Sequence, residues 1–370
     1  MQTLIAYPTF LQLMGMNTIS KHLQNILIKT GIHVAELKNL GDMLNKNAFA
    51  YKDKSLLRIM PSLKPLADLA NSEKNSDRLN KLIDMLETST FTGEASFFSI
   101  TGRVLAAYEL MQQVKDELTP AIAAAGELDM YVACAKLYNS RTNKDNKYCF
   151  AQFVESKTPV LEAKNFWNPF INPDTVVPND ALFNDQNRNI LLTGPNTGGK
   201  STILKGLMIN VIMAQTFGIA PADSLTLTPF AKLNCFMNIS DDIATGASLF
   251  KAEVLRAKNL LETIKSLKHN EFSFVIIDEV FTGTSPKEGE MAAFRFAKTI
   301  GEYPNSTNII ATHYPKMIDL EDETKGIFKN FHIEVLRNPD GSINRTFKLK
   351  RGPTLMNIAF DILEEEGMFI

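Results

Sequence analysis

A glycine-rich loop between an apolar run and a helical stretch constrains this chain more than any other feature. The loop, Gly194-Pro195-Asn196-Thr197-Gly198-Gly199-Lys200-Ser201, fits the pattern GxxxxGK[ST] and follows the run NILLT of residues 189–193. That run predicts a strand buried on both faces of a parallel sheet, and residues 202–217 predict the helix after it. The backbone N–H groups of such a loop converge on phosphate oxygens at the positive end of the helix dipole. We therefore expect a P-loop that binds nucleotide phosphates together with Thr202, in which Lys200 reaches the β and γ phosphates and Ser201 supplies a hydroxyl to Mg²⁺.

Two further predicted strands end in side chains suited to phosphate chemistry. Residues 272–277, FSFVII, are followed by Asp278 and Glu279, and residues 307–312 are followed by His313. The carboxyl ends of parallel strands meet at one edge of a sheet, where ligands of open α/β folds bind. In a P-loop fold the first carboxylate completes the Mg²⁺ shell and the second polarises the attacking water. We therefore assign Asp278 to the metal, Glu279 to general-base catalysis and His313 to sensing the γ-phosphate.

The pattern of predicted elements divides the chain into two parts. Up to about residue 160, apolar residues recur with helical spacing and strand patterns are nearly absent. After residue 188, short apolar runs alternate with helical segments, which is typical of an α/β domain. We expect an all-α domain over residues 1–160 and a P-loop domain with a mixed, largely parallel sheet over residues 161–370. Helices are predicted at 10–30, 56–69, 77–86, 102–118, 119–138, 202–217, 247–267 and 287–300, a hairpin at 331–336 and 344–350, and a last helix at 354–366.

The composition is that of an ordinary folded protein without a global field that would attract nucleic acid. Lys and Arg number 39, Asp and Glu number 41, the net charge is −2, and 45% of the residues are hydrophobic. These values exclude disordered and supercharged classes, and any contact with DNA must come from a local patch or an oligomeric channel. The three cysteines have no CxxC spacing, which favours reduced thiols over a disulfide or zinc site. The sequence has neither a signal-peptide pattern nor a membrane-span pattern, so we expect a cytoplasmic protein.

The motifs, in this order, resemble those of the MutS mismatch-repair ATPases. TGPNTGGKST is similar to the family's TGPNMGGKST, with Thr197 in place of methionine, and GELDMYV at 126–132 is similar to part of the family's helical lever. The resemblance implies an ABC-type ATPase domain after a lever-like domain, with ATP and Mg²⁺ as cofactors and Asn196 contacting the phosphates. It also includes Pro221-Ala222, Asp241-Asp242, Ser248-Leu249-Phe250 with Glu253, Asp278-Glu279, Gly283-Thr284-Ser285 and Ala311-Thr312-His313-Tyr314.

The resemblance further implies a homodimer formed through the ATPase domains. Ser248 of one subunit would complete the nucleotide site of the other, although taken alone it is a helix cap. Thr245 and Ala247 stand where the family prefers Ser and a basic residue. Val176 stands where the family has the aromatic side chain that stacks on the purine, and Phe183 is the alternative aromatic in the sequence.

For function, the resemblance implies a role in DNA mismatch repair or recombination through a nucleotide-gated dimer. We expect the chain of 370 residues to lack the mismatch-recognition and connector domains of full-length MutS proteins. The alternative is a nucleotide-switched structural or signalling dimer that does not bind DNA. A P-loop kinase is disfavoured by the Ser248 signature and the Asp278-Glu279 pair. The sequence does not identify a repair-protein partner.

Overall fold

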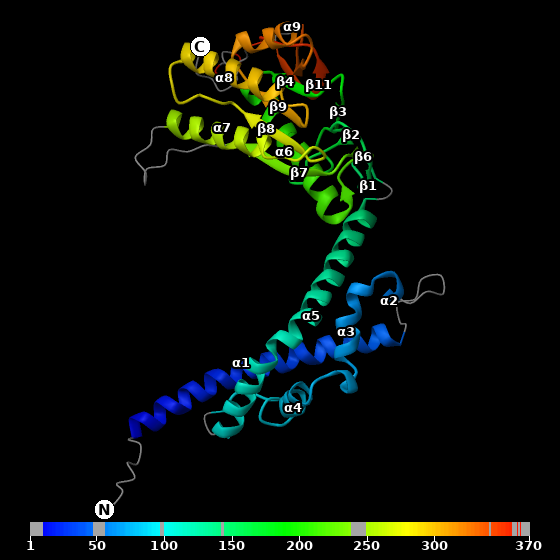
Figure 1. The fold of residues 1–370 in the computed structure, drawn as a ribbon, viewed down its shortest axis with the longest axis vertical. Coiled ribbons are helices and arrows are strands. Elements are labelled where there is room, and N and C mark those ends of the chain that lie inside the picture. Colours follow the sequence, from blue (N-terminus) through cyan, green and yellow to red (C-terminus); the bar gives the residue numbers. More distant parts are fainter. Residues whose placement is uncertain are drawn as a thin grey trace, which may run out of the picture. The chain divides into compact units, whose positions relative to one another are not determined.

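The computed structural model describes residues 10–46, 56–96, 100–141, 144–237, 249–339, 342–356, 361 and 363. The chain forms two compact units, Met1–Ala133 and Cys134–Ile370, which we call the helical unit and the sheet unit (Figure 1). Within the described ranges, no helix is long and apolar enough to cross a membrane.

The described part of the helical unit consists of helices joined by short turns. Leu27 of α1 packs with Leu82 of α4 and Val104 of α5 in one buried cluster. The predicted helix 77–86 is confirmed as α4, and Ser76 caps it by accepting a hydrogen bond from the Leu79 amide at 3.1 Å. Residues 56–69 form two short helices around a 3-10 turn instead of the single helix predicted. The helices are α1 (Phe10–Asn45), α2 (Leu56–Ile59), α3 (Lys64–Leu69), α4 (Asp77–Leu86) and α5 (Thr101–Ser140), with 3-10 turns at Pro61–Leu63 and Ser72–Lys74.

Helix α5 is continuous through Pro120, so the predicted division into helices 102–118 and 119–138 is wrong. A proline inside a helix removes one backbone hydrogen bond and usually ends or kinks the helix. Pro120 is exposed, so water can reach the carbonyl group that it leaves without a partner. Leu118, Ala121 and Ala124 meanwhile continue one buried face across the proline. Packing of that face holds the helix together where the local rule predicts a break.

The described strands of the sheet unit form two sheets. The larger has the order β11-β10-β4-β9-β8-β7 and is parallel except for the edge strand β11. The smaller has the order β3-β2-β6-β1-β5. The predicted α/β class with a mixed, largely parallel sheet is confirmed, and β1 already lies inside the range 1–160 that was expected to be helical. The strands are β1 (Cys149–Phe153), β2 (Leu161–Phe166), β3 (Asn179–Phe183), β4 (Asn189–Thr193), β5 (Ile219–Ala220), β6 (Ser224–Leu227), β7 (Phe230–Phe236), β8 (Phe272–Asp278), β9 (Ser306–Ala311), β10 (Phe328–Arg337) and β11 (Ile343–Arg351).

Helices cover both faces of the larger sheet (Figure 1). Ile190 and Leu192 of β4 pack in one cluster with α6, whereas Leu191 packs in another with α7 and α8. Successive residues of a strand point to opposite faces, which is why β4 is buried at every position. Because β4, β8 and β9 are parallel, the loops that follow them lie at one edge of the sheet. The helices are α6 (Lys200–Phe217), α7 (Leu249–Lys265), α8 (Pro286–Gly301) and α9 (Leu320–Glu323), the last preceded by a 3-10 segment, Pro315–Asp319.

The predicted last helix, 354–366, can be compared only in part. Residues 354–356 are not helical, residues 361 and 363 are, and the others lie outside the described residues. The predicted start at Thr354 is therefore wrong. The Thr354 amide instead donates to Oγ1 of Thr193, at the end of β4, over 2.9 Å.

Candidate nucleotide-binding site

Three neighbouring strands of the larger sheet end at the same level. Leu192 of β4 and Asp278 of β8 both pair with Ala311 of β9. The P-loop therefore begins beside the segment that carries His313. Glu279, which follows β8, lies on the other side of that segment. The sheet register brings together three motifs that are far apart in the sequence.

Lys200 lies over the backbone of its own P-loop. Residues 196–198 form a 3-10 turn, and Gly199, with a φ of +96°, is left-handed directly before α6 begins. The Lys200 side chain is 3% exposed, and its Nζ donates to the carbonyl oxygens of Gly194 at 2.8 Å and Pro195 at 3.2 Å. Burial lowers the pKa of Lys200, and the nearby carboxylates of Glu279 and Asp278 oppose that shift.

His313 links Lys200 to Glu279. Its Nε2 lies 2.7 Å from Oε1 of Glu279 and 2.9 Å from Nζ of Lys200. An imidazole nitrogen either donates or accepts a hydrogen bond, so Nε2 serves one of these partners at a time. The hydrogen bond with His313 lowers the pKa of the Glu279 carboxyl, against the opposing effect of burial. Glu279 is therefore ionised and accepts from Nε2–H of His313. Lys200 then donates to the P-loop carbonyls and not to His313.

The turn after β8 is left-handed at two residues that are not glycine. Glu279 has a φ of +53° and Phe281 a φ of +62°, a conformation that costs such residues about 1–3 kcal/mol each. The Glu279 amide donates to the Ala311 carbonyl at 3.1 Å, and the Phe281 carbonyl accepts from the Tyr314 hydroxyl at 2.9 Å. These bonds to the segment after β9 hold the strained turn in place beside His313.

Asp278 and Ser201 are suited to hold a hard cation. Oδ1 of Asp278 is buried and has no hydrogen-bond partner among the described residues, and a buried polar atom without a partner is costly unless something binds it. Ser201, in the first turn of α6, is exposed. Within the described ranges, no group of three or more His, Cys, Asp or Glu could hold a metal ion. One carboxylate and one hydroxyl fit Mg²⁺, which is usually bound by few protein oxygens together with phosphates and water.

Phe347, which the sequence did not single out, lies against the P-loop. A Cβ on Gly199 would be 3.1 Å from Cδ1 of Phe347, whose side chain is 40% exposed. Asn179 holds this part of β11, because its side chain donates to the Phe347 carbonyl at 3.0 Å and accepts from the Leu349 amide at 2.7 Å. The only signal in the sequence was an aromatic residue within a basic strand, and that signal does not reveal contact with residue 199.

The two residues that the sequence analysis considered for contact with the purine, Val176 and Phe183, are packed elsewhere. Val176 packs in a cluster with Tyr148 and Trp167. Phe183 is completely buried and contacts Phe274 with ring centroids 5.8 Å apart, so it is not available to stack on a purine as the alternative aromatic residue. Among these three side chains, Phe347 alone is both exposed and beside the P-loop.

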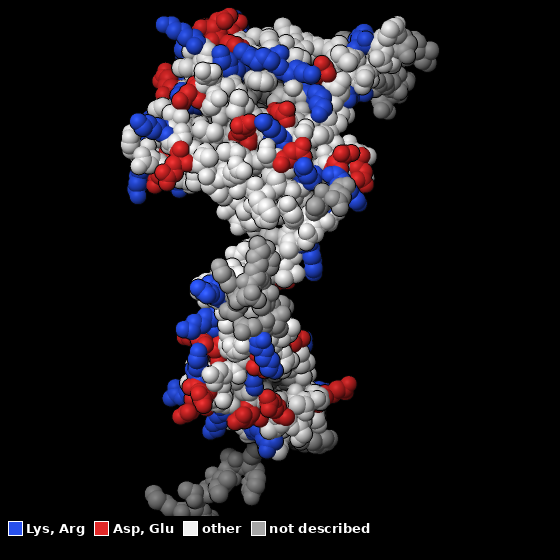
Figure 2. Space-filling view, turned by 90° about the vertical axis from the view of Figure 1, so that its right-hand side faces the viewer, with Lys and Arg blue, Asp and Glu red and all other residues white. Residues whose placement is uncertain are grey.

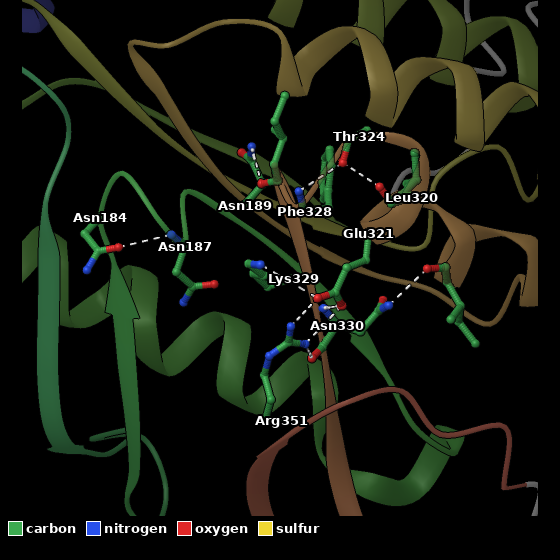
Figure 3. Close-up of polar contacts among 12 residues, drawn as sticks. Asn184, Asn187, Asn189, Leu320, Glu321, Thr324, Phe328, Lys329, Asn330 and Arg351 are labelled. Atoms are coloured by element: carbon green, nitrogen blue, oxygen red, sulfur yellow. Dashed lines mark hydrogen bonds and ion pairs between the residues drawn. The ribbon is translucent and has the colours of Figure 1, made fainter.

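A charged cluster anchors the end of β11. Both terminal guanidinium nitrogens of Arg351 donate to the carboxylate of Glu321 in α9, and the Asn330 amide donates to it at 2.9 Å. Figure 3 shows Glu321 between Lys329, Asn330 and Arg351. Burial alone would raise the pKa of Glu321, but the hydrogen bonds from Arg351 and the Asn330 amide keep it below its usual value. The strand that carries Phe347 is thereby held at that residue, at Leu349 and at its last residue, Arg351.

Several predicted site residues lie outside this description. Ser248, Asp241-Asp242, Thr245 and Ala247 fall outside the described residues, as does the side chain of Asn196. Their roles stay predictions. Pro195, Thr197, Gly198 and Thr202 lie in the loop and the first turn of α6, where the sequence placed them.

A strand, a GxxxxGK[ST] loop and a helix, with two carboxylates and a histidine at neighbouring strand ends, define a P-loop nucleotide-binding domain of the α/β class. Comparison with known families is more specific, because residues 190–366 match MutS domain V. This part of the chain therefore belongs to the MutS family.

Relatives with established names are similar over a larger part of the chain. The DNA mismatch repair protein MutS of Geobacillus sp. (strain WCH70) is 25% identical over 261 residues, which are 70% of this chain and 30% of that protein. The protein of the same name from Symbiobacterium thermophilum is 31% identical over 246 residues, 64% of this chain and 26% of that protein. Endonuclease MutS2 of Staphylococcus epidermidis is 30% identical over 260 residues, 68% of this chain and 30% of that protein. The chain thus covers less than a third of the length of these relatives.

Proposed function

We propose that this protein binds ATP with Mg²⁺ and hydrolyses it by in-line attack of water. One observation carries the proposal: Nε2 of His313 lies within 2.9 Å of both Lys200 and Glu279, at the sheet edge where the P-loop begins. A cation at that place can stabilise the phosphate charge, a carboxylate can act as a general base toward water, and a histidine can donate to a phosphate oxygen. The match to MutS domain V supports the same activity.

Each of these side chains has its own part in the proposed reaction. Lys200 exchanges the carbonyls of Gly194 and Pro195 for the β and γ phosphates and stabilises the charge of the transition state. His313 turns its Nε2–H from Glu279 to the γ-phosphate. Glu279, kept ionised by its lowered pKa, accepts the proton of the attacking water. Mg²⁺ held by Ser201 and Asp278 would act as a Lewis acid on the phosphate oxygens.

We also propose that two copies associate through their ATPase domains, with Ser248 of one copy completing the site of the other, and that the dimer acts on DNA in repair or recombination. The names of the relatives support a role on DNA. The alternative is a nucleotide-switched dimer that does not bind DNA. One face of the helical unit supports it, because Figure 2 shows Lys and Arg interspersed with Asp and Glu there.

The purified chain is expected to release phosphate from ATP only when Mg²⁺ is present, because Ser201 and Asp278 hold the cation only together with the nucleotide. Phosphate release is measured with Mg²⁺ and with excess EDTA. Anisotropy titrations with duplex, mismatched and branched DNA at several salt concentrations test the role on DNA, since phosphate contacts weaken as salt rises. Hydrolysis without binding to any of these DNAs at low salt would support the alternative. No hydrolysis in any condition would contradict the proposed activity.

We further propose that Phe347, exposed and beside Gly199, stacks on the purine of ATP. Phe347→Ala is then expected to raise the KM for ATP about tenfold with a smaller effect on kcat, because a base stacked on an aromatic ring contributes about 1–3 kcal/mol. Steady-state kinetics of the variant are compared with those of Leu336→Ala, an exposed apolar residue on the neighbouring strand β10. Inorganic triphosphate, which has no base, should inhibit both variants equally well. An unchanged KM for ATP would show that Phe347 does not contact the purine.

A further inference from the structure

Glu253 is a buried carboxylate that the proposed reaction does not use. It lies near the start of α7, which begins directly after Ser248 in the chain, and it is 1% exposed. Its Oε1 accepts from the Thr282 amide at 3.0 Å and the Thr282 hydroxyl at 3.4 Å, and its Oε2 accepts from the Gly283 amide at 3.1 Å. Hydrogen bonds from amides to a carboxylate are stronger than those between neutral groups. The carboxylate therefore ties α7 to the turn that follows Glu279.

Two packing contacts hold the same turn against α7. A Cβ on Gly283 would lie 2.6 Å from the Phe250 amide nitrogen, so only glycine allows the turn to approach the helix this closely. The rings of Phe250 and Phe281 also meet edge to face, with centroids 5.9 Å apart. Residues 281–283 thus touch the start of α7 through a carboxylate, a glycine and an aromatic pair.

The same turn is held from its other side by the segment that carries His313. The Tyr314 hydroxyl donates to the Phe281 carbonyl at 2.9 Å. Gly289 of α8 leaves room for this bond, because a Cβ there would collide with both the Phe281 carbonyl and the Tyr314 hydroxyl. Burial raises the pKa of Tyr314, and the charges of Glu253, Glu279 and Glu290 add to that shift. Tyr314 therefore lies close to carboxylates of both α7 and the turn.

We propose that Glu253 is a positioning residue that couples the nucleotide site of a chain to the start of its own helix α7. The inference rests on the proposed function, in which Glu279 loses the hydrogen bond from His313 when the site fills and Ser248 serves the partner subunit. Only Val280 lies between Glu279 and Phe281, so a shift of the Glu279 backbone displaces residues 281–283. Glu253 passes that displacement to α7, because it accepts hydrogen bonds from two of their amides. Filling of one site is thereby transmitted to the helix that serves the other.

Glu253→Gln tests this coupling because it keeps the size of the side chain but turns an amide donor toward the donors of Thr282 or Gly283. In the full-length protein we expect kcat to fall about tenfold or more from the loss of positioning, with the ATP dissociation constant unchanged. Hydrogen–deuterium exchange with and without Mg²⁺ and the non-hydrolysable analogue AMP-PNP gives the direct readout. The analogue should protect the P-loop in both proteins, and the start of α7 and residues 282–283 in the wild type only. Glu262→Gln, an exposed carboxylate on the same helix, is the matched control.

The outcomes distinguish a coupling role of Glu253 from a role in stability alone. They also distinguish failure of the coupling from failure of the proposed ATP hydrolysis. A merely structural role would lower the melting temperature and the exchange protection of the empty protein, but would leave the change caused by the analogue intact, and that result would overturn the proposal. A wild type that binds the analogue but does not turn over ATP would contradict the proposed function alone, since the exchange readout needs no hydrolysis. If Glu253→Gln does not fold, Glu253→Asp carries the same test, because it keeps the charge while its shorter side chain reaches the Thr282 and Gly283 amides less well. An unchanged α7 response in Glu253→Asp would also overturn the proposal.

Discussion

Glu279→Gln is expected to lower ATP turnover about 100-fold or more, the usual contribution of a general base, and to leave ATP binding nearly intact. An amide has the shape of the carboxylate but cannot take a proton from water. His313 can still donate to the amide oxygen, which preserves the contact of 2.7 Å. The lowered pKa of Glu279 means that the wild-type group is ionised and able to act as the base throughout the neutral pH range.

Single-turnover measurements of phosphate release separate this loss of chemistry from slow product release. Glu302→Gln is a suitable control, because it makes the same substitution at an exposed position just past the end of α8. Binding is followed separately with a fluorescent ATP analogue. Turnover by Glu279→Gln equal to that of the wild type would refute the general-base assignment, and a large loss of binding would mean that Glu279 mainly holds the site in shape.

The residues of the nucleotide site were predictable where an apolar run directly before them indicates the end of a strand. The apolar runs before Gly194 and Asp278 and before His313 each predict a strand, and parallel strands place their carboxyl ends at one edge. The sequence thus indicates which residues share the edge, but not that Lys200 and Glu279 both approach the same nitrogen of His313.

Contacts between distant segments were not predictable from local patterns. Phe347 lies against Gly199 only because the edge strand β11 returns along β10. Pro120 illustrates the converse, since a strong local signal for a helix end is overridden by a buried face that continues on both sides of it. In each case a contact between segments that are distant in the sequence decides the structure. The pattern of one segment alone does not reveal such a contact.

Mixing two inactive variants is expected to restore ATP hydrolysis if Ser248 acts on the partner's nucleotide. A heterodimer of Lys200→Ala and Ser248→Ala has one site with both defects and one site with neither. Equal mixing of freely exchanging subunits in a two-fold symmetric dimer should therefore give about a quarter of the wild-type activity. Phosphate release is measured over a series of mixing ratios, with a maximum expected at equal amounts.

A second mixture controls for restoration by any other route. Lys200 and Glu279 contact the same His313, so they belong to one site within one chain. Lys200→Ala mixed with Glu279→Gln leaves every site of the heterodimer with a defect, and no activity should return at any ratio. Restoration in both mixtures would point to subunit exchange that merely stabilises the chains. No restoration in either would make Ser248 a cap of α7 within its own chain, and would leave Glu253 as a link inside one subunit and not a path between two sites.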